Sequence, residues 1–345
     1  MFPNHLRRKN PDRGRFREWG DVLLLLLLLT HLVGCDTVRK PAVDLTVEKT
    51  GLVRSDRLAD LLGLSERWVV AGSRLAMDGA AGHLEIESGR REANARGVRL
   101  FLGEPVTVAN GHLYVSRTDM ESLLMPIFKG TGAKGAGPIR TIAVDAGHGG
   151  RDNGTMNREL GLNEKNLTLD VAKRLRDALR RRGYVVIMTR TGDEFVPLEQ
   201  RPKRAHGADL FISIHFNATG NSRSSGSETY VLSPAGQAST GTSLPTTGDM
   251  TFVPGNRWDA PSAAFGFIVQ SGLLKELGTV DRGLKHARFA VLRDLPCPGV
   301  LVESAFLSNH AEATRVASEA FRSRLAENLA GSVEAFAKLA GEGLP

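Results

Sequence analysis

The sequence predicts an α/β protein, with a twisted, mostly parallel sheet flanked by helices and a small α+β domain in front of it. Two observations predict this fold. After residue 140, apolar runs of strand length alternate with amphipathic stretches of helix length. Before residue 128, a short helical stretch and several short strands follow one another. Between the two parts, residues 129–139 are rich in glycine, which is typical of a linker.

The first 35 residues are excluded from the fold. A basic segment is followed by an apolar run from Val22 to Val33. That run is shorter than the roughly 20 residues that span a bilayer, and it is typical of a secretory signal peptide. It ends in Leu-Val-Gly-Cys35, which resembles a bacterial lipobox, in which the cysteine becomes the lipidated first residue. An ordinary signal peptide with an incidental cysteine is the alternative. Residues 36–48 then form a tether.

Composition excludes several classes of protein. The formal net charge is +7, and part of it comes from the basic N-terminal segment. The remainder is too mild to indicate nucleic acid, and no nucleic-acid-binding motif is present. With two cysteines, the chain has no disulfide framework. If Cys35 is lipidated, Cys297 has no partner within the chain and is expected to be a small buried residue.

The small domain, residues 49–128, is expected to contain one helix at each end and strands between them. The pair Asn110-Gly111 between two apolar runs predicts a tight hairpin. The expected elements, in order, are a helix at LADLLGL, strands at WVVAG, RLAMDG, HLEIESG and VRLFLG, the hairpin in EPVTVANGHLYVS, and a helix at DMESLLMPIF.

The large domain, residues 140–341, is expected to alternate strands and helices. One stretch breaks the alternation: residues 233–262 are rich in Ser, Thr, Gly and Pro and predict a long mobile loop that flanks the site. The expected strands are TIAVDAG, YVVIMTR, DLFISIHFNA, SETYVLS, FAVLR and GVLVESA. The expected helices are NLTLDVAKRLRDALRRRG, LEQRPKRAHG, AAFGFIVQSGLLKELG and one that runs from about Glu312 to Leu339.

Two histidines stand at the ends of predicted strands. His148 follows TIAVDA through a glycine-rich turn, and His215 ends the run LFISI. Either one alone would more often be structural, but parallel strand ends lie at the same edge of a sheet. Glu164, at the start of the first long helix, supplies a third candidate ligand, although a glutamate there also suits the helix dipole. Two histidines and one carboxylate are a common catalytic zinc set.

A zinc site that activates water also needs a base. Glu303 lies at the end of the apolar run GVLVESA, where an unpaired charge is costly unless it serves a purpose. It could take a proton from water and pass it to a leaving amine. Arg282 is a candidate for binding substrate carboxylates or for a structural ion pair, and Asn217 for shaping the pocket floor. His206, His286 and His310 are expected at the surface or in loops.

Five motifs, in this order, resemble the zinc-dependent N-acetylmuramoyl-L-alanine amidases of the amidase-3 group: VDAGHGGRDNG, NEKNLTLDVAKRL, YVVIMTR, FISIHFNA and VLVESAFLSN. The resemblance implies that His148, Glu164 and His215 bind Zn²⁺ and that Glu303 is the catalytic glutamate. It implies hydrolysis of the amide between N-acetylmuramic acid and L-alanine in peptidoglycan. The pattern of residues 49–128 resembles the copper-amine-oxidase N-terminal-like domain.

The resemblance and the N-terminal segment together predict a lipoprotein of the cell envelope. It would be anchored to a membrane through Cys35, face the periplasm or wall, and remodel peptidoglycan or separate daughter cells. Some family members block the zinc with a helix in the segment matching residues 233–280 until a partner removes it, so an activator protein is a candidate partner. Asp259 and Glu276 are candidates for such a plug. The alternative is a catalytically silent peptidoglycan-binding lipoprotein.

Overall fold

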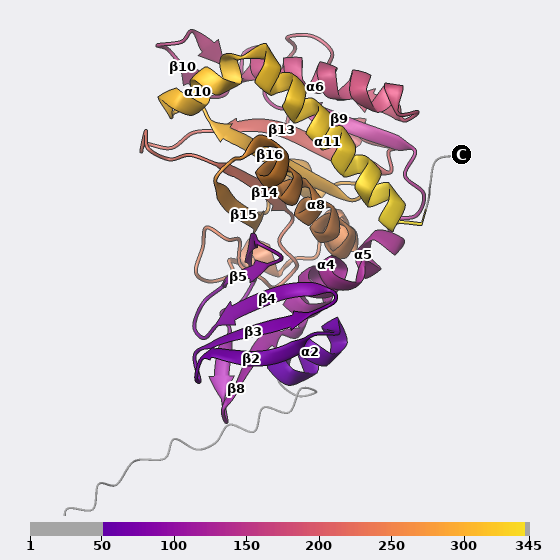
Figure 1. Cartoon of the computed structure of the whole chain (residues 1–345). Coiled ribbons are helices and arrows are strands. Elements are labelled where there is room, and N and C mark those ends of the chain that lie inside the picture. Colours follow the sequence, from indigo (N-terminus) through magenta and orange to yellow (C-terminus); the bar gives the residue numbers. More distant parts are fainter. Residues whose placement is uncertain (1–50, 342–345) are drawn as a thin grey trace, which may run out of the picture. The chain divides into compact units, whose positions relative to one another are not determined.

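Within residues 51–341, eleven strands form one mixed sheet in the order β12-β9-β13-β16-β14-β15-β6-β5-β4-β3-β2 (Figure 1). The computed structural model describes these residues, and all of them lie within one unit of the chain, Ala42–Pro345. The predicted signal peptide, Cys35 and the tether lie outside the described residues. Among the described helices, none combines the length and the apolar character needed to cross a membrane.

Most of the strands around the candidate site are apolar runs that the sequence predicts. β12, β9, β13 and β16 pair in parallel, whereas β14 is antiparallel to β16 and parallel to β15. Helices cover both faces, so β9, β13 and β16 are mostly apolar. The bounds are Val185–Met188 (β12), Thr141–Ala146 (β9), Leu210–Asn217 (β13), Gly299–Phe306 (β16), Ser227–Val231 (β14) and Asp281–His286 (β15).

Three long helices pack together on one face of the sheet. Helix α11 contacts both α6 and α8, α6 contacts β9, and α8 contacts β14 and β16 (Figure 1). The bounds are Glu164–Arg181 (α6), Asp259–Leu277 (α8) and Glu319–Leu339 (α11). Since alternate strand residues point to opposite faces, Ile142 and Val144 join this core.

A second, smaller core lies on the opposite face. Ala143, between Ile142 and Val144, belongs to it together with Phe211 and Leu292. The expected buried position of Cys297 is confirmed, because its thiol is free and buried in this cluster. The short helices on this side are Gln200–Arg204 (α7) and Ala290–Arg293 (α9), and the hairpin before α6 is formed by Met156–Asn157 (β10) and Leu162–Asn163 (β11).

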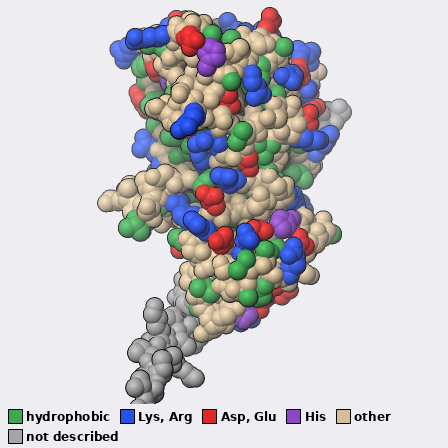
Figure 2. All heavy atoms as spheres, turned by 60° about the vertical axis from the view of Figure 1, so that its left-hand side comes forward, with side chains coloured by type: hydrophobic (Ala, Val, Ile, Leu, Met, Phe, Trp, Pro, Cys, Tyr) green, Lys and Arg blue, Asp and Glu red, His purple; other side chains and the backbone are tan. Residues whose placement is uncertain are grey.

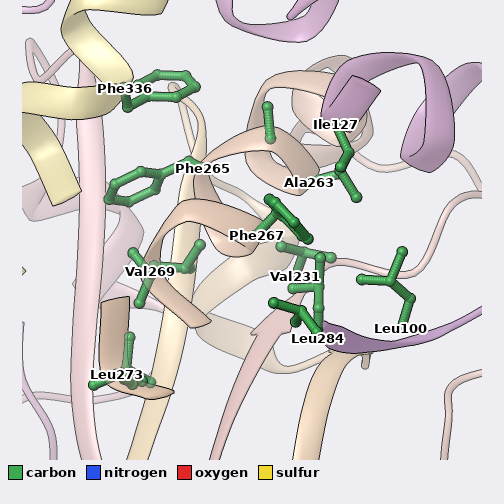
Figure 3. Close-up of a cluster of buried hydrophobic side chains, with 14 of the residues drawn as sticks. Leu100, Ile127, Val231, Ala263, Phe265, Phe267, Val269, Leu273, Leu284 and Phe336 are labelled. Carbon is green, nitrogen blue, oxygen red and sulfur yellow. The ribbon is translucent and has the colours of Figure 1, made fainter. Parts of the chain in front are cut away.

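The strands of the predicted small domain continue the large sheet. β6 pairs in parallel with β15 at Leu100 and Leu284, and β2 to β6 form an antiparallel meander. Figure 3 shows Leu100 and Ile127 beside Val231 and Phe267, so both parts of the chain share one core. The bounds are Ser65–Val70 (β2), Arg74–Gly79 (β3), Gly82–Glu87 (β4), Glu92–Ala95 (β5) and Val98–Phe101 (β6).

A three-stranded sheet of order β1-β8-β7 contains the predicted hairpin. Ala109 pairs with His112, which leaves Asn110 and Gly111 as the two turn residues, and both have positive φ, 49° and 77°. This is the backbone of a type I′ turn, so the prediction is confirmed. The bounds are Leu52–Arg54 (β1), Ser55–Leu62 (α2), Thr107–Ala109 (β7), His112–Ser116 (β8), Arg117–Asp119 (α3), Met120–Leu124 (η1, a π-helix) and Met125–Lys129 (α4).

Two predicted elements are wrong. The run FAVLR was expected as a strand, but Ala290–Arg293 form helix α9, and the strand lies earlier, at Asp281–His286. Val291 and Leu292 are adjacent and both are buried, which suits a helical turn rather than alternation. The final helix is two helices, His310–Ala317 (α10) and Glu319–Leu339, separated by Ser318 in an extended conformation.

Two stretches expected to be irregular contain helices. Residues 129–139 include Thr131–Lys134 (α5), in which Ala133 is fully buried. Residues 233–262 include two 3₁₀ helices, Thr247–Met250 (η2) and Pro254–Trp258 (η3), and α8 begins at Asp259. Arg91, from the stretch before β5, donates hydrogen bonds to the carbonyl oxygens of Ala238 and Thr242. The predicted loop is therefore held by the N-terminal strands.

Charged side chains of both signs are interspersed on the face that Figure 2 shows. Many basic side chains of the described residues pair with a carboxylate, as Arg182 does with Glu327 and Glu334 on α11. The positive charge of the chain thus forms no continuous patch on this face.

Candidate metal centre

Neighbouring parallel strands bring the two predicted histidines to one edge of the sheet. β9 and β13 pair in register, with Ala146 opposite Ile214. His215 follows Ile214 directly, and His148 comes two residues after Ala146. Glu164 is the first residue of α6, which the β10–β11 hairpin leads back to the same edge. Because the two strands pair in parallel, His148 and His215 lie close together although 67 residues separate them in the sequence.

The three side chains form a compact group. One oxygen of Glu164, Oε1, lies 3.1 Å from Nε2 of His148 and 3.1 Å from Nδ1 of His215. All three candidate ligand atoms lie within 4.8 Å of one another. The two imidazole rings meet edge to face, with centroids 4.9 Å apart. Two nitrogens and one carboxylate oxygen at this spacing match the ligand set of a catalytic zinc site.

Backbone groups fix the carboxylate of Glu164, which is only 3% exposed. The amide of Phe216 donates to Oε1 at 3.0 Å, and the amide of Thr155 donates to Oε2 at 2.8 Å. Burial raises the pKa of Glu164, but the hydrogen bonds and charges of His148 and His215 outweigh it and hold the pKa well below its ordinary value. The carboxylate is thus ionised at neutral pH, as a metal ligand must be.

The turn that carries His148 is strained and tightly packed. His148 has φ +60°, a left-handed conformation that non-glycine residues rarely adopt. Its Nδ1 lies 2.9 Å from Oδ2 of Asp152, which leaves Nε2 pointing toward Glu164. Such a carboxylate partner orients a metal-binding imidazole. A Cβ on Gly147 would lie 2.3 Å from the ring of His215, so only glycine fits there.

Two buried arginines donate hydrogen bonds to the backbone of this turn. Arg201 donates to Asp145 Oδ1 at 2.8 Å, to the carbonyl of Ala146 at 2.8 Å and to the carbonyl of His148 at 2.9 Å. Arg190 donates to the carbonyl of Ala146 at 2.9 Å and to that of Gly147 at 2.8 Å. Every carbonyl from Ala146 to His148 therefore accepts a hydrogen bond from a guanidinium group, and the strained backbone is fixed.

Glu303 lies one strand away from the metal-site candidates. Its register partner on β13 is His215, and its register partner on β14 is Glu228. Oε2 of Glu303 is buried and has no hydrogen-bond partner among the described residues. Burial, followed by the charges of Glu164 and Glu228, raises the pKa of Glu303 well above its ordinary value. A carboxyl group with these properties suits proton transfer.

A second carboxylate, Glu228, lies next to Glu303 and contacts two other candidate residues, Asn217 and Arg282. It accepts hydrogen bonds from Asn217 at 2.6 Å and Tyr230 at 2.8 Å on Oε1, and from Arg282 at 2.9 Å and Lys285 on Oε2. Burial raises its pKa, but Lys285, Tyr230 and Arg282 lower it below the ordinary value. The structure thus joins Asn217 and Arg282 to Glu228, next to Glu303.

Sequence reasoning missed the supporting residues. Asp145 stands in a buried strand run, and Asp152 stands four residues after His148, so both gave signals that could have been followed. Glu228 is a lone acid in a strand pattern, which is the same signal that identified Glu303. Arg190 and Arg201 gave none, because most of their partners are backbone carbonyls of other segments.

Other expected positions are placed as follows. His286 was expected at the surface or in a loop, which is wrong: it is 3% exposed on β15, and its Nδ1 lies 3.1 Å from the carbonyl of Phe101. Asp259 accepts a hydrogen bond from Asn256 at 3.1 Å, at the start of α8. Glu276 is exposed near the end of α8. Among the described contacts, neither acid reaches the group of His148 and its partners.

Comparison with known proteins gives a consistent family assignment. The sequence profile of the family Amidase_3, described as N-acetylmuramoyl-L-alanine amidase, matches residues 142–335. The chain is 35% identical over 189 residues to the N-acetylmuramoyl-L-alanine amidase LytC of Bacillus subtilis (strain 168), covering 54% of this chain and 33% of that protein. It is 35% identical over 236 residues to AmiC, an enzyme of the same description from Neisseria meningitidis serogroup B, covering 60% of this chain and 54% of that protein.

A solved structure agrees with the fold. The crystal structure of an N-acetylmuramoyl-L-alanine amidase from Clostridium difficile 630 aligns with a TM-score of 0.50 and 28% identity, covering 60% of this chain and all of that chain. The α/β fold predicted from the sequence is thereby confirmed. The match to the two curated relatives is partial, since this chain spans about a third of LytC and about half of AmiC.

Proposed function

This chain belongs to the Amidase_3 family of N-acetylmuramoyl-L-alanine amidases, and from that premise we propose that it hydrolyses the amide between N-acetylmuramic acid and L-alanine in peptidoglycan. One observation carries the proposal. Beside the group formed by His148, Glu164 and His215, the neighbouring strand carries Glu303, whose Oε2 is buried and has no hydrogen-bond partner among the described residues. The expected biological role is remodelling of the cell wall or separation of daughter cells.

We further propose that His148, Glu164 and His215 hold Zn²⁺. The donor set supports this, because imidazole nitrogen and carboxylate oxygen are zinc ligands and three protein ligands are typical of a catalytic site. The orienting hydrogen bond that Nδ1 of His148 donates to Asp152 supports it as well. When bound, zinc would supply a Lewis acid that polarises the scissile carbonyl and makes water more acidic.

Glu303 is the proposed proton-transfer residue. Its carboxylate accepts a proton from the water that attacks the carbonyl carbon, and the protonated carboxyl then donates that proton to the nitrogen of the departing L-alanine. A raised pKa suits both steps, because the carboxyl group can hold the proton between them near neutral pH.

The test is direct cleavage of intact peptidoglycan by the purified protein. Mass spectrometry should find free peptides that begin with L-alanine, and elemental analysis should find bound zinc. Glu303→Gln should keep the zinc and lose the cleavage. Glu121→Gln is the matched control, since Glu121 is exposed on η1 and makes no side-chain hydrogen bond to a described residue.

The alternative remains the catalytically silent peptidoglycan-binding lipoprotein. Binding of zinc and of peptidoglycan by the wild type without any cleavage would favour this alternative and contradict the enzyme. Cleavage that is equal in the wild type and in Glu303→Gln would keep the enzyme but remove Glu303 from its mechanism.

We also propose that the protein is exported and anchored to a membrane through lipidated Cys35. The support is the signal-like segment with its lipobox and a substrate that lies outside the cytoplasm. The Cys35→Ser variant should incorporate no labelled palmitate, and it should be found in the soluble fraction and not in the membrane fraction. Cys297→Ser is the matched control, because the buried Cys297 should leave labelling unchanged. Incorporation of label into Cys35→Ser would contradict the anchor.

Three further predictions from the sequence stay predictions. These are the domain boundaries, the likeness of residues 49–128 to the copper-amine-oxidase N-terminal-like domain, and an activator protein. The pairing of β6 with β15 supports the idea that the N-terminal strands stabilise the catalytic sheet. Deleting residues 51–128 would test this, since the exposed edge of β15 should then lower solubility.

A further inference from the structure

The side chain of Arg282 is anchored at one end and free at the other. Its Nε donates to Glu228 Oε2 at 2.9 Å, and its guanidinium carbon lies 4.7 Å from the ring centroid of Phe306. The two terminal amino groups make no hydrogen bond to any residue within 51–341. About a third of the side chain, 34%, is exposed. The planar fork of the guanidinium is therefore held in place and open to solvent.

Glu228 forms ion pairs with two basic side chains, Arg282 and Lys285, so its single negative charge balances one of the two positive charges. Glu228 is the one acid that Arg282 and Lys285 both contact in the described structure. Its oxygens are fully used, since Asn217 and Tyr230 also donate to it. Lys285 is 13% exposed, so the accessible part of the excess charge is the fork of Arg282.

Glu312 is the other carboxylate near Arg282. It accepts hydrogen bonds from the backbone amides of Gly226 at 2.8 Å and Phe306 at 2.7 Å, and the charge of Arg315 acts on it more strongly than that of Arg282. It does not pair with the terminal amino groups of Arg282. The two terminal amino groups of Arg282 are therefore available to bind a carboxylate of a ligand. An arginine binds a carboxylate with two parallel hydrogen bonds.

The position of Arg282 relative to Glu303 limits where that carboxylate lies. Glu303 and Glu228 are register partners on adjacent strands, and Arg282 is on the next strand, β15. Two strand spacings of about 4.8 Å place its backbone roughly 10 Å from that of Glu303. An extended peptide spans about 3.3–3.6 Å per residue, so a carboxylate two or three residues from the scissile amide reaches this distance.

We propose that Arg282 recognises a carboxylate in the peptide part of the substrate, close to the scissile amide. The proposal rests on the proposed amidase function, because it takes Glu303 as the point of cleavage. The sugar side offers no competing anion, since the carboxyl group of N-acetylmuramic acid is itself part of the amide that is cut. Arg282 is thus a specificity residue, and Glu228 is a positioning residue that holds its fork.

Two synthetic probes test the proposal with the purified full chain. One is N-acetylmuramoyl-L-alanyl-D-glutamate with the γ-carboxyl group of glutamate capped as a methylamide, so that the α-carboxylate is its single free carboxylate. The other is the same molecule with the α-carboxylate of glutamate replaced by a carboxamide. The wild type should cleave the acid with a kcat/KM about 10-fold higher, as loss of a charged hydrogen bond predicts. In Arg282→Gln this ratio should fall to within about 2-fold of unity.

Matched variants separate recognition from folding. Arg282→Lys keeps the charge but loses the fork, so its acid-to-amide ratio should fall between those of the wild type and Arg282→Gln. Arg293→Gln should keep the wild-type ratio, because Arg293 is exposed on α9 and makes no side-chain hydrogen bond to a described residue. Equal cleavage of both probes by the wild type, or an unchanged ratio in Arg282→Gln, would overturn the proposal.

Failure of the proposed function would be visible separately. If the wild type cleaves neither probe, the amidase assignment fails for these substrates. Calorimetric titration of the same probes onto Glu303→Gln, with and without Arg282→Gln, then still decides the role of Arg282. A Kd about 10-fold lower for the acid that disappears with Arg282→Gln supports recognition, and equal values refute it.

Discussion

Replacing Arg201 with methionine should destabilise the turn that carries His148. Arg201 is 2% exposed and its partner Asp145 is fully buried. The substitution removes one buried ion pair and the hydrogen bonds to the carbonyls of Ala146 and His148. Methionine fills much of the same apolar space, so the effect isolates the lost polar contacts.

The expected loss of unfolding free energy is about 3 kcal/mol. Removing one partner of a buried ion pair costs about 3–5 kcal/mol. The lower end applies here because Thr189 and Ser213 still donate to Asp145, at 2.6 and 2.7 Å. The carbonyl of Ala146 also keeps its hydrogen bond from Arg190. Only the carbonyl of His148 loses a guanidinium donor without replacement.

The assay is urea unfolding followed by circular dichroism, with a chelator present so that metal binding does not contribute. Zinc affinity, measured by competition with a chromophoric chelator, should fall about 10- to 100-fold, as for other groups that orient a ligand. Lys203→Met is the control on the same helix, since Lys203 is exposed. A loss below about 1 kcal/mol, together with unchanged zinc affinity, would refute the idea that Arg201 holds this turn.

Three more outcomes are expected. Glu303→Gln should lower kcat on peptidoglycan by at least about 100-fold with zinc content unchanged, while an active variant would remove Glu303 from proton transfer. Gly147→Ala should abolish zinc binding in an elemental assay, because the new Cβ would lie 2.3 Å from the ring of His215; full zinc occupancy would contradict the packing argument. Burial lowers the pKa of His286 to about 4, whereas the pKa of a histidine in the unfolded chain is about 6.5. The unfolded chain therefore binds a proton more readily than the folded protein below pH 6.5. As the pH falls from 6.5 to 4, the free energy of unfolding should decrease by about 3 kcal/mol. Urea unfolding across that range should show a shallower pH dependence in His286→Gln, and equal slopes would exclude His286 as the cause.

Local patterns in the sequence predict local structure well. Asn110-Gly111 specified a type I′ hairpin because both turn residues must adopt positive φ, which asparagine and glycine tolerate. The run FAVLR failed for the opposite reason. A short apolar run suits a strand or a buried helical turn equally, and only the packing of Val291 and Leu292 into the second core makes it a helix.

The candidate metal ligands were accessible to sequence reasoning because the rule that connects them is general. The ends of parallel strands meet at one edge of a sheet, so histidines at two such ends are expected to meet. Their support was not accessible. Arg190 and Arg201 bind backbone carbonyls of the His148 turn, and backbone carbonyls carry no residue-specific signal in the sequence.

By itself, the sequence determined which residues are candidates for the chemistry, since imidazole, carboxylate and thiol groups are properties of single side chains. It also determined where strands, turns and helices could form, since propensity and periodicity act over a few residues. Only the tertiary structure decided the row from His215 through Glu303 to Glu228 and on to Arg282. That row depends on β14 pairing antiparallel with β16 and parallel with β15. Strand order and direction are set by packing between segments far apart in the chain, which no short pattern encodes.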